Sequence, residues 1–288
     1  MDKNAGIIGT GKLGINILHH LKKNGIKISG IFNKDIFKSE TTAKKAGVIF
    51  FKDKNILVHE SDIIFITTPD DIIHKVANEI ASNNNELGNK IFFHCSGSLP
   101  STILENLEKK NALTASMHPL QSFAGLLEEK NPFKNIIMGI EGNKQAVETA
   151  EIISKKLGAI PYFLKTEGKI LYHTAAVTAS NYLVTLTEKA LELLETAGIE
   201  KEKGLNIITP LMKGTIENII SKGTKKALTG PVSRGDYETV KSHMEQISKK
   251  APEIRSFYKI MCEETIKLAE SSGAINRSQS KKIIKALE

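Results

Sequence analysis

The sequence predicts a doubly wound α/β sheet followed by an all-helical domain, and three observations lead to that prediction. In the first half of the chain, short β-type runs alternate with helical patterns, which is the element order of an α/β sheet. Several runs are continuously apolar, as in Ile63-Ile64-Phe65-Ile66, and such runs are typical of parallel strands buried on both faces. Beyond Thr166 the strand signals stop and only helical patterns remain. We therefore expect domains at residues 1–165 and 166–288.

The expected elements have recognisable boundaries. Asp236 is a candidate N-cap, Pro252 suits a first helical turn, and Gly198 follows the end of a long helical pattern. The expected strands cover residues 5–9, 27–32, 48–51, 62–67, 90–94, 113–117, 135–140 and 160–164. The expected helices cover residues 12–24, 35–46, 71–82, 99–110, 143–157, 167–197, 201–222, 236–250, 252–272 and 278–287.

The composition excludes several classes of protein. The 288 residues include 37 Lys and 3 Arg and carry a formal net charge of +8, but the lysines occur singly or in pairs among acidic residues, which argues against nucleic-acid binding. No apolar run approaches the ~20 residues of a membrane span. Two widely spaced cysteines exclude a disulfide scaffold. We expect a cytoplasmic protein that binds neither nucleic acid nor membrane.

The turn after the first strand has the glycine spacing of a dinucleotide-binding turn. The run Gly9-Thr10-Gly11-Lys12-Leu13-Gly14 matches G-x-G-x-x-G and stands between an apolar strand and a helix. Gly9 would form the tight turn, Gly11 would admit a pyrophosphate, and Gly14 would let helix and strand pack closely. The sequence therefore predicts a Rossmann domain in which this run meets the phosphates at a helix N-terminus.

The end of the second strand indicates which dinucleotide binds. NAD sites place an acidic residue there, on the ribose 2′-hydroxyl. Here the strand ends in Asn33-Lys34, which offer a hydrogen-bond donor and a positive charge for a 2′-phosphate. Asp35, one position later, is expected to begin the next helix. This favours NADP(H), although Lys34 is alternatively one more solvated lysine.

Three neighbouring strand ends carry small, hydroxylated or imidazole side chains. In open parallel sheets, ligands bind beyond the carboxyl ends of the strands, so these residues would gather at one edge. The alternative for each is an ordinary polar turn. The residues expected to contact cofactor or substrate at this edge are Thr67, Thr68, Pro69, Ser96, His118 and Ser122.

Cys95 invites two further interpretations, and we favour neither. As a nucleophile it would need a base in a recognisable order, but it stands between His94 and Ser96 without one. A zinc site formed by His94, Cys95 and His118 would lack the close paired spacing of common structural sites. We therefore expect no metal.

The first helix of the second domain carries polar groups at four-residue steps. Lys169, His173 and Asn181 share one slowly turning stripe, with Val177 between them. The surrounding run Ala175-Ala176-Val177-Thr178-Ala179-Ser180 is small and suits close packing around a cofactor. Alternatively, His173 and Asn181 are satisfied core groups and Lys169 is a surface residue.

A glycine-flanked loop between later helices carries one of the three arginines. Arg234 and Asp236 lie in Thr229-Gly230-Pro231-Val232-Ser233-Arg234-Gly235-Asp236. Where lysine is so favoured, an arginine suggests planar recognition of a carboxylate or phosphate. The alternative is a structural contact between Arg234 and Asp236 within the turn.

Taken together, the motifs resemble a family of two-domain Rossmann-type proteins with a six-phosphogluconate-dehydrogenase-like helical domain. The resemblance covers nearly the whole chain and rests on GIIGTGKLG, HCSGSLP, SMHPLQSF, LYHTAAVTASNYL and LTGPVSRGD. It implies a distant relation to pyrroline-5-carboxylate reductase and to coenzyme-dependent NADP reductases. Some bacterial members of the family are a divergent class of ketopantoate reductase, so the resemblance implies reduction of 2-dehydropantoate to pantoate, for pantothenate and coenzyme A.

The helix stripe departs from the better-known ketopantoate reductases. Those enzymes carry a lysine and two asparagines at successive four-residue steps. The matching positions here are His173, Val177 and Asn181, and Lys169 lies one turn earlier. An imidazole is the best proton donor near neutral pH, so we expect His173 as the general acid, with Lys169 as the alternative.

Further roles follow as expectations. Asn181 would hold the substrate carbonyl. His118, Ser96 and Ser122 would position a small carboxylate substrate, and Arg234 and Asp236 would bind its acid group. The apolar helices of the second half, together with the resemblance, predict a homodimer through the helical domain. The alternatives are a reductase of another keto or imino acid, such as pyrroline-5-carboxylate, and a non-catalytic NADP(H)-binding sensor.

Overall fold

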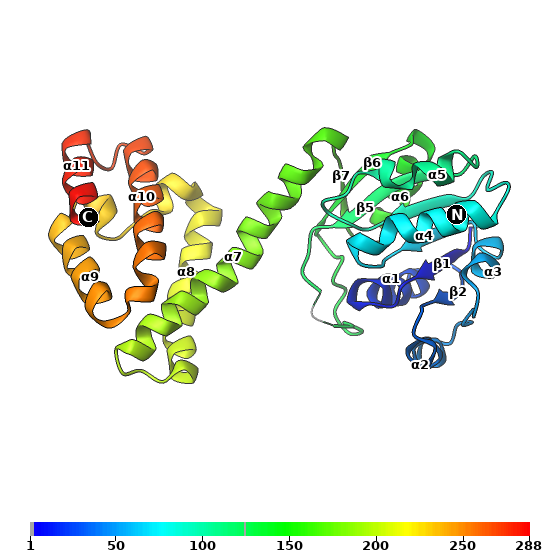
Figure 1. Ribbon diagram of the computed structural model, residues 1–288, viewed down its shortest axis with the longest axis horizontal. Helices are drawn as coiled ribbons and strands as arrows, with labels where there is room; N and C mark the ends of the chain where they lie inside the picture. The colour runs from blue at the N-terminus through cyan, green and yellow to red at the C-terminus, as the bar shows by residue number, and fades with distance from the viewer. Residues whose placement is uncertain (1–2, 124) are drawn as a thin grey trace. The chain divides into compact units, whose positions relative to one another are not determined.

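The computed structural model describes residues 3–123 and 125–288, and the chain separates into two compact units (Figure 1). The first unit is Met1–Asn181 and the second is Tyr182–Glu288. The division falls inside α7 (Lys169–Thr196), so the first half of that helix belongs with the sheet. The last strand ends at Phe163, and the domain boundary at 165 stays a prediction.

The first unit is built on one seven-stranded sheet of order β2-β1-β3-β4-β5-β6-β7. Strands β1 to β5 are parallel, β6 is antiparallel to β5, and β7 is parallel to β6. The doubly wound α/β prediction is thereby confirmed. The strands are β1 (Ala5–Ile8), β2 (Ile28–Phe32), β3 (Ile63–Ile66), β4 (Ile91–His94), β5 (Leu113–Pro119), β6 (Ile137–Gly142) and β7 (Ile160–Phe163).

Helices cover both faces of this sheet, which is why its strands are apolar throughout. On one face, α1, α2 and α6 bury the side chains of Ile63 and Phe65 in a common core. On the other face, α3, α4 and α5 bury Ile64 and Ile66. The helices of this unit are α1 (Lys12–Lys23), α2 (Ile36–Ala46), α3 (Lys54–His59), α4 (Asp70–Asn83), α5 (Glu105–Glu108) and α6 (Lys144–Leu157), together with the start of α7.

Two predicted elements differ from the structure. Residues 48–51 form only a bridge between Phe50 and Ile31, because α3, which Asp53 caps, follows at once. The predicted helix 99–110 is a 3₁₀ turn (Ser101–Leu104) followed by the single turn of α5. The short helix α3 itself was not predicted.

The second unit is entirely helical, as predicted. Its core joins α9, α10 and α11 through residues such as Val240, Ile266 and Ile283. Helix α8 breaks at Gly223, whose φ of 74° is left-handed, one residue after the predicted helix end. No helix in the described ranges combines the length and apolarity that crossing a membrane requires. The helices are α8 (Lys201–Ala227), α9 (Tyr237–Lys250), α10 (Arg255–Ser271) and α11 (Arg277–Ala286).

A buried ion pair ties the start of α7 to the sheet. The Lys169 ammonium lies 3.3 Å from Glu141 Oε1 of β6 and also donates to the Ser116 hydroxyl of β5. Glu141 accepts two further hydrogen bonds from Ser101, through its N–H and its hydroxyl, each at 2.7 Å, and one from Thr166 at 3.1 Å. Burial lowers the pKa of Lys169 below its ordinary value, and Glu141 opposes that shift.

Replacing one partner of this pair is expected to destabilise the fold. Lys169→Met leaves the buried Glu141 carboxylate without its counter-charge, which costs about 3–5 kcal/mol of unfolding free energy. The double variant Lys169→Met/Glu141→Gln removes both charges and is expected to regain at least ~1 kcal/mol. Urea unfolding followed by circular dichroism measures both. A double variant less stable than the single one would show that the pair is not the source of the effect.

Candidate functional site

The glycine turn has the geometry that a dinucleotide site requires. Gly9 has a φ of 99°, which L side chains rarely adopt, and Thr67 of the β3 end donates from its hydroxyl to Gly9 O at 2.6 Å. A Cβ on Gly14 would collide with Gly9 O and with the Thr67 hydroxyl. A Cβ on Gly11 would meet nothing within 4 Å. The turn is therefore closely packed on the protein side and open at Gly11.

The open side of this turn fits a bound pyrophosphate. No side chain caps the N-terminus of α1, so its first N–H groups remain available to an anion. The buried Thr68 hydroxyl has no hydrogen-bond partner among the described residues. Of the other predicted contacts, Lys12 is exposed at the first helical position, Leu13 packs against the core, and Pro69 directly precedes α4.

The end of β2 has no carboxylate free to bind a ribose. Asn33 donates from its side chain to the Thr10 hydroxyl at 2.7 Å, which links this strand end to the glycine turn. Asp35 instead caps α2, accepting a hydrogen bond from Lys38 N at 3.0 Å. Lys34 is exposed. The side chains near a 2′-substituent are thus an amide and an ammonium, which suits a phosphate.

Asp70 joins the ends of β3 and β4. Its Oδ2 accepts from the hydroxyls of Ser96 at 2.7 Å and Ser98 at 2.8 Å. The Ser96 hydroxyl also accepts from Leu99 N at 3.0 Å. Ser96 therefore shapes the turn that follows β4, and its role in binding cofactor or substrate stays a prediction.

His94 and Cys95 lie behind this turn rather than in it. His94 Nδ1 accepts from Ser96 N at 3.2 Å, and a proton on Nε2 then satisfies Pro100 O at 3.2 Å. Burial, and the nearby charge of Lys169, lower the pKa of His94 to about 3. Burial raises the pKa of the Cys95 thiol to about 12, so it is protonated at neutral pH and is a poor nucleophile. Within the described residues, no cluster of metal-ligating side chains occurs.

Two histidines meet across Gly97. His118 of β5 and His173 of α7 have ring centroids 6.0 Å apart, at an interplanar angle of 69°. A Cβ on Gly97 would lie 2.7 Å from His118 Nε2 and would collide with the His173 ring. Only glycine at the end of β4 therefore lets both imidazoles approach the backbone. Gly97 lies within the HCSGSLP run, but the sequence alone gives no signal for this role.

The two histidines line a cavity of about 400 Å³ at the first unit's sheet edge. That volume lies within the range of small-molecule sites. Ser122 and Asn181, both predicted from the sequence, line it as well. Its lining in full is His118, Leu120, Gln121, Ser122, His173, Ala176, Val177, Ala179, Ser180 and Asn181.

His118 is held neutral. Burial first, and then the charges of Lys169 and His173, lower its pKa to about 4. Its Nδ1 is buried and has no partner among the described residues, and the same is true of the Tyr172 hydroxyl. The Tyr172 ring meets His118 edge-on, with centroids 5.8 Å apart. Tyr172 was not predicted, although it directly precedes His173 in the sequence.

The remaining predicted residues have other surroundings. Lys169 does not line the cavity, because its ammonium is bound to Glu141 and Ser116. Asp236, in the second unit, caps α9 by accepting from Thr239 N at 3.1 Å and from its hydroxyl at 2.7 Å. Arg234 is exposed in the same loop. The catalytic role of Lys169 and the substrate-binding roles of Arg234 and Asp236 stay predictions.

Comparison with known proteins agrees with this architecture. Residues 4–96 match the family model described as NADP oxidoreductase, coenzyme F420-dependent, and residues 136–265 match a domain of unknown function, DUF2520. The first match confirms the NADP(H) cofactor that Asn33 and Lys34 predict. Among the curated proteins, none matches the chain.

Three solved structures illustrate the likeness. Protein TM1727 from Thermotoga maritima is 30% identical, with a TM-score of 0.71, covering 93% of this chain and 99% of that one. A putative NADP oxidoreductase from Bacteroides fragilis is 20% identical, with a TM-score of 0.74 and coverages of 92% and 98%. A Plasmodium falciparum pyrroline carboxylate reductase with NADP bound is 16% identical, with a TM-score of 0.57 and coverages of 93% and 98%.

Two glycine substitutions are expected to separate cofactor binding from folding. Gly11→Ala places a methyl group in open space, so the melting temperature should stay unchanged while NADPH affinity falls about tenfold or more, ~1.4 kcal/mol. Gly14→Ala forces the helix from the strand and should destabilise the fold by about 1–3 kcal/mol. Calorimetric titration with NADPH and thermal unfolding measure the two effects. Unchanged NADPH affinity in Gly11→Ala would contradict the pyrophosphate assignment.

Acid is expected to destabilise the first unit through its buried histidines. The pKa values of His94 and His118 are near 3 and 4 in the folded chain, against 6.5 when unfolded, so the unfolded chain binds protons first as pH falls. Their contribution is complete above about pH 6.5 and is lost as pH falls toward about 4 for His118 and about 3 for His94, at up to ~1.4 kcal/mol per unit for each. Urea unfolding across that range should show a shallower pH dependence for His118→Gln. An unchanged slope would refute the neutral state of His118.

Proposed function

This chain belongs to the same family as protein TM1727 of Thermotoga maritima, and from that premise we propose that it is an NADPH-dependent reductase of a small keto or imino acid. One observation carries the proposal: a series of contacts lies along the carboxyl edge of the parallel strands. Thr67 binds the glycine turn, Asp70 joins the ends of β3 and β4, and Gly97 then brings His118 and His173 together. The cofactor turn and the histidine-lined cavity are thus parts of one edge.

The side chains of the cavity supply what a reduction requires. Bound NADPH supplies the hydride. His173 donates a proton to the substrate atom on which negative charge develops. Asn181 donates a hydrogen bond from its amide to the same group, and neutral His118 orients the substrate without adding charge. Lys169 does not contact the substrate, because its ammonium remains paired with Glu141. Its charge acts on the cavity only through space.

The proposed substrate is 2-dehydropantoate, which would be reduced to pantoate. The polar lining residues Gln121, Ser122 and Ser180 can hydrogen-bond to its carboxylate and hydroxyl, and Val177 and Ala176 can contact its methyl groups. The second candidate is a cyclic imino acid such as pyrroline-5-carboxylate. The likeness to a pyrroline carboxylate reductase supports that candidate.

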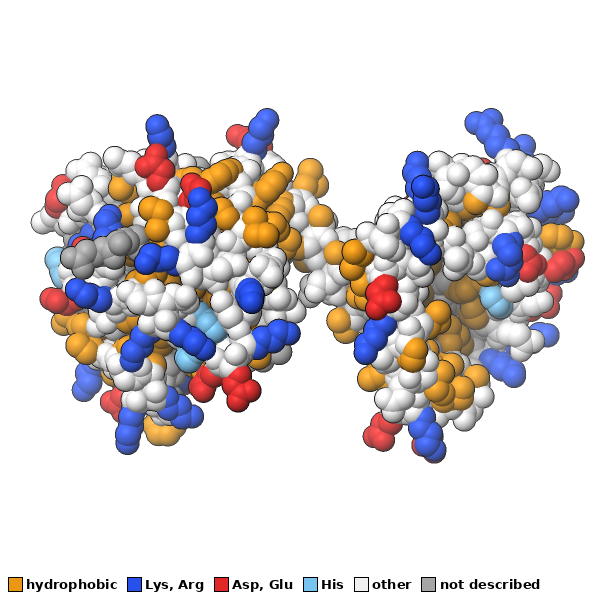
Figure 2. Space-filling model, turned by 180° about the vertical axis from the view of Figure 1, so that it is seen from behind, with side chains coloured by type: hydrophobic (Ala, Val, Ile, Leu, Met, Phe, Trp, Pro, Cys, Tyr) orange, Lys and Arg blue, Asp and Glu red, His pale blue; other side chains and the backbone are white. Residues whose placement is uncertain are grey.

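We also propose that the protein is a homodimer formed through its long helices. Large apolar side chains lie exposed on α7 and α8, including Val184 at 70%, Leu211 at 71% and Ile220 at 80% exposure. Figure 2 shows hydrophobic side chains on the surface of the helical unit. Exposed apolar surface of this extent is typical of protein interfaces. Sedimentation at several protein concentrations tests the proposal. The two buried free cysteines are compatible with the cytoplasmic location that the sequence suggests.

Absorbance of NADPH during incubation with each substrate tests the activity, with NADH in parallel. Consumption with 2-dehydropantoate supports the first candidate, and consumption only with pyrroline-5-carboxylate supports the second. Tight NADPH binding without turnover on a panel of keto and imino acids would instead indicate a sensor and refute the proposed reductase.

His173→Gln is expected to lower kcat by about 10²–10⁴ on the accepted substrate, because the proton donor is lost. The dissociation constant of NADPH should stay within about twofold, since no contact of the glycine turn changes. Steady-state kinetics and NADPH titration give the two values. His74→Gln, an exposed histidine of α4, is the matched control and should behave as wild type. Wild-type turnover in His173→Gln would eliminate His173 as the acid.

A further inference from the structure

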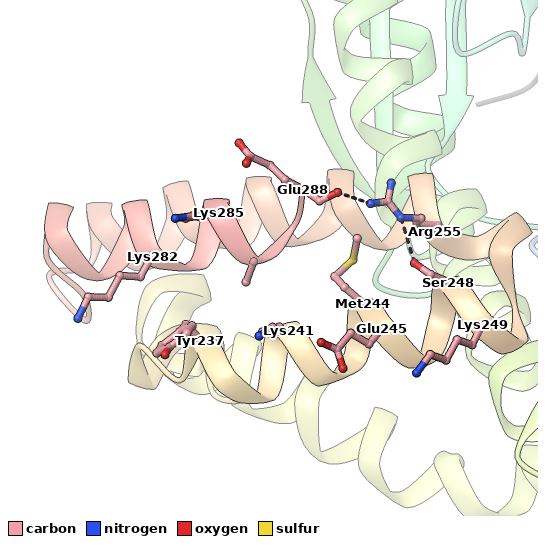
Figure 3. A pocket seen from close by; sticks show the side chains of 11 residues that line it. Tyr237, Lys241, Met244, Glu245, Ser248, Lys249, Arg255, Lys282, Lys285 and Glu288 are labelled. Atoms are coloured by element: carbon pink, nitrogen blue, oxygen red, sulfur yellow. Dashed lines mark hydrogen bonds between the residues drawn. The ribbon is translucent and has the colours of Figure 1, made fainter.

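A second cavity, of about 700 Å³, lies wholly within the helical unit (Figure 3). Side chains from one face of α9 and from α11 line it, and Met244 extends from α9 into the space between these helices. Its volume is within the range of small-molecule sites. The glycine turn and the histidine cavity use none of its residues.

The lining of this cavity is strongly basic. Lys241 and Lys249 come from α9, Lys282 and Lys285 from α11, and Arg255 from the start of α10. The two carboxylates in the lining, Glu245 and Glu288, do not balance these five cations. Among the described residues, none of the five forms an ion pair. Uncompensated cations that share a concave surface create a positive potential that attracts anions.

Arg255 is held in position at this cavity. Its Nε donates to the Ser248 hydroxyl at 3.1 Å, and one terminal nitrogen donates to the main-chain oxygen of Glu288 at 2.7 Å (Figure 3). The other terminal nitrogen has no acceptor within the described parts of the chain. A guanidinium fixed in this way offers donors at low entropic cost. The chain contains only three arginines, and one of them stands here.

The lining also includes apolar groups. Met244 is buried, Ala286 is partly buried, and Tyr237, at the start of α9, is 38% exposed. A bare inorganic anion would leave these groups uncovered. A ligand with an organic part would cover them while its charges meet the lysines. Phosphate suits those lysines better than a carboxylate, because it carries more charge and more acceptor oxygens.

We propose that this cavity between α9 and α11 binds a phosphorylated small organic molecule. Its phosphates pair with the lysines of the two facing helices and with Arg255, and its organic part packs on Met244, Ala286 and Tyr237. The helical unit thereby carries a ligand site of its own, in addition to the NADPH site of the sheet.

Calorimetric titration of the full-length protein with ADP and with pyrophosphate tests this proposal. Saturating NADPH is present throughout, so that the glycine turn is already filled. Both probes are expected to bind saturably. ADP should bind at least as tightly as pyrophosphate, because its organic part also covers Met244, Ala286 and Tyr237. Absence of saturable binding for both probes would overturn the proposal. Weaker binding of ADP than of pyrophosphate would overturn the inference that the ligand has an organic part.

Neighbouring lysines provide a matched control. Lys249 and Lys282 line the cavity, whereas Lys250 and Lys281, next to them on the same helices, are exposed and do not. Lys249→Gln/Lys282→Gln is expected to weaken ADP binding about tenfold, and Lys250→Gln/Lys281→Gln should change it less than about twofold. Both double variants change the net charge equally, and their melting temperatures report on folding. Equal weakening in both would show a general charge effect and refute the site.

Discussion

The geometry of the candidate active site depends on one buried carboxylate. Glu141 accepts hydrogen bonds from Ser101 and Thr166 and pairs with Lys169. Its partners come from the segment after β4, the segment after β7 and the first turn of α7, so one side chain fixes three parts of the chain. His173 lies one helical turn beyond Lys169, and its position beside His118 follows from that anchor. A charged pair of this kind has little value as a source of net stability, but it strongly restricts the alternative placements of α7.

Glycines impose the second constraint, because they set how closely the chain approaches itself at the sheet edge. Gly14 brings α1 against the β3 end, and Gly97 brings the β4 end against two imidazoles. In both places the space that a Cβ would need is occupied by polar groups: Gly9 O and the Thr67 hydroxyl at Gly14, and the two imidazoles at Gly97. The positive φ of Gly9 completes the same edge. The shape of the sheet's carboxyl edge therefore depends on glycines, which have no side chain, as much as on the side chains that line it.

The fold could be predicted in some detail, because continuous apolar runs and helical periods persist over many residues. Residues 48–51 were misassigned since their apolar pattern is that of a strand, while the chain turns into α3 after a single bridge. The glycine turn was predictable because its function is local in sequence. His118 and His173 were identified individually, but their meeting across Gly97 depends on three separate elements. The pairing of Lys169 with Glu141 left no local signal, because periodicity places a lysine on a helix stripe without showing which carboxylate it meets.

The reversal of β6 relative to β5 has a consequence for how this cavity can change. Strands β6 and β7 run from the carboxyl edge of the parallel strands toward the opposite edge. Helix α7 therefore begins beside the sheet, where Lys169 pairs with Glu141, and runs back along the sheet past His118. The cavity is thus bounded on one side by the flank of a helix, while Leu120, Gln121 and Ser122 of the segment after β5 complete its lining. The small residues Ala176, Ala179 and Ser180 on that flank can be exchanged for larger ones while the backbone stays in place. Substrate range in this architecture can therefore diverge by single substitutions at helical intervals, with His173, the proposed proton donor, and the glycine turn left unchanged.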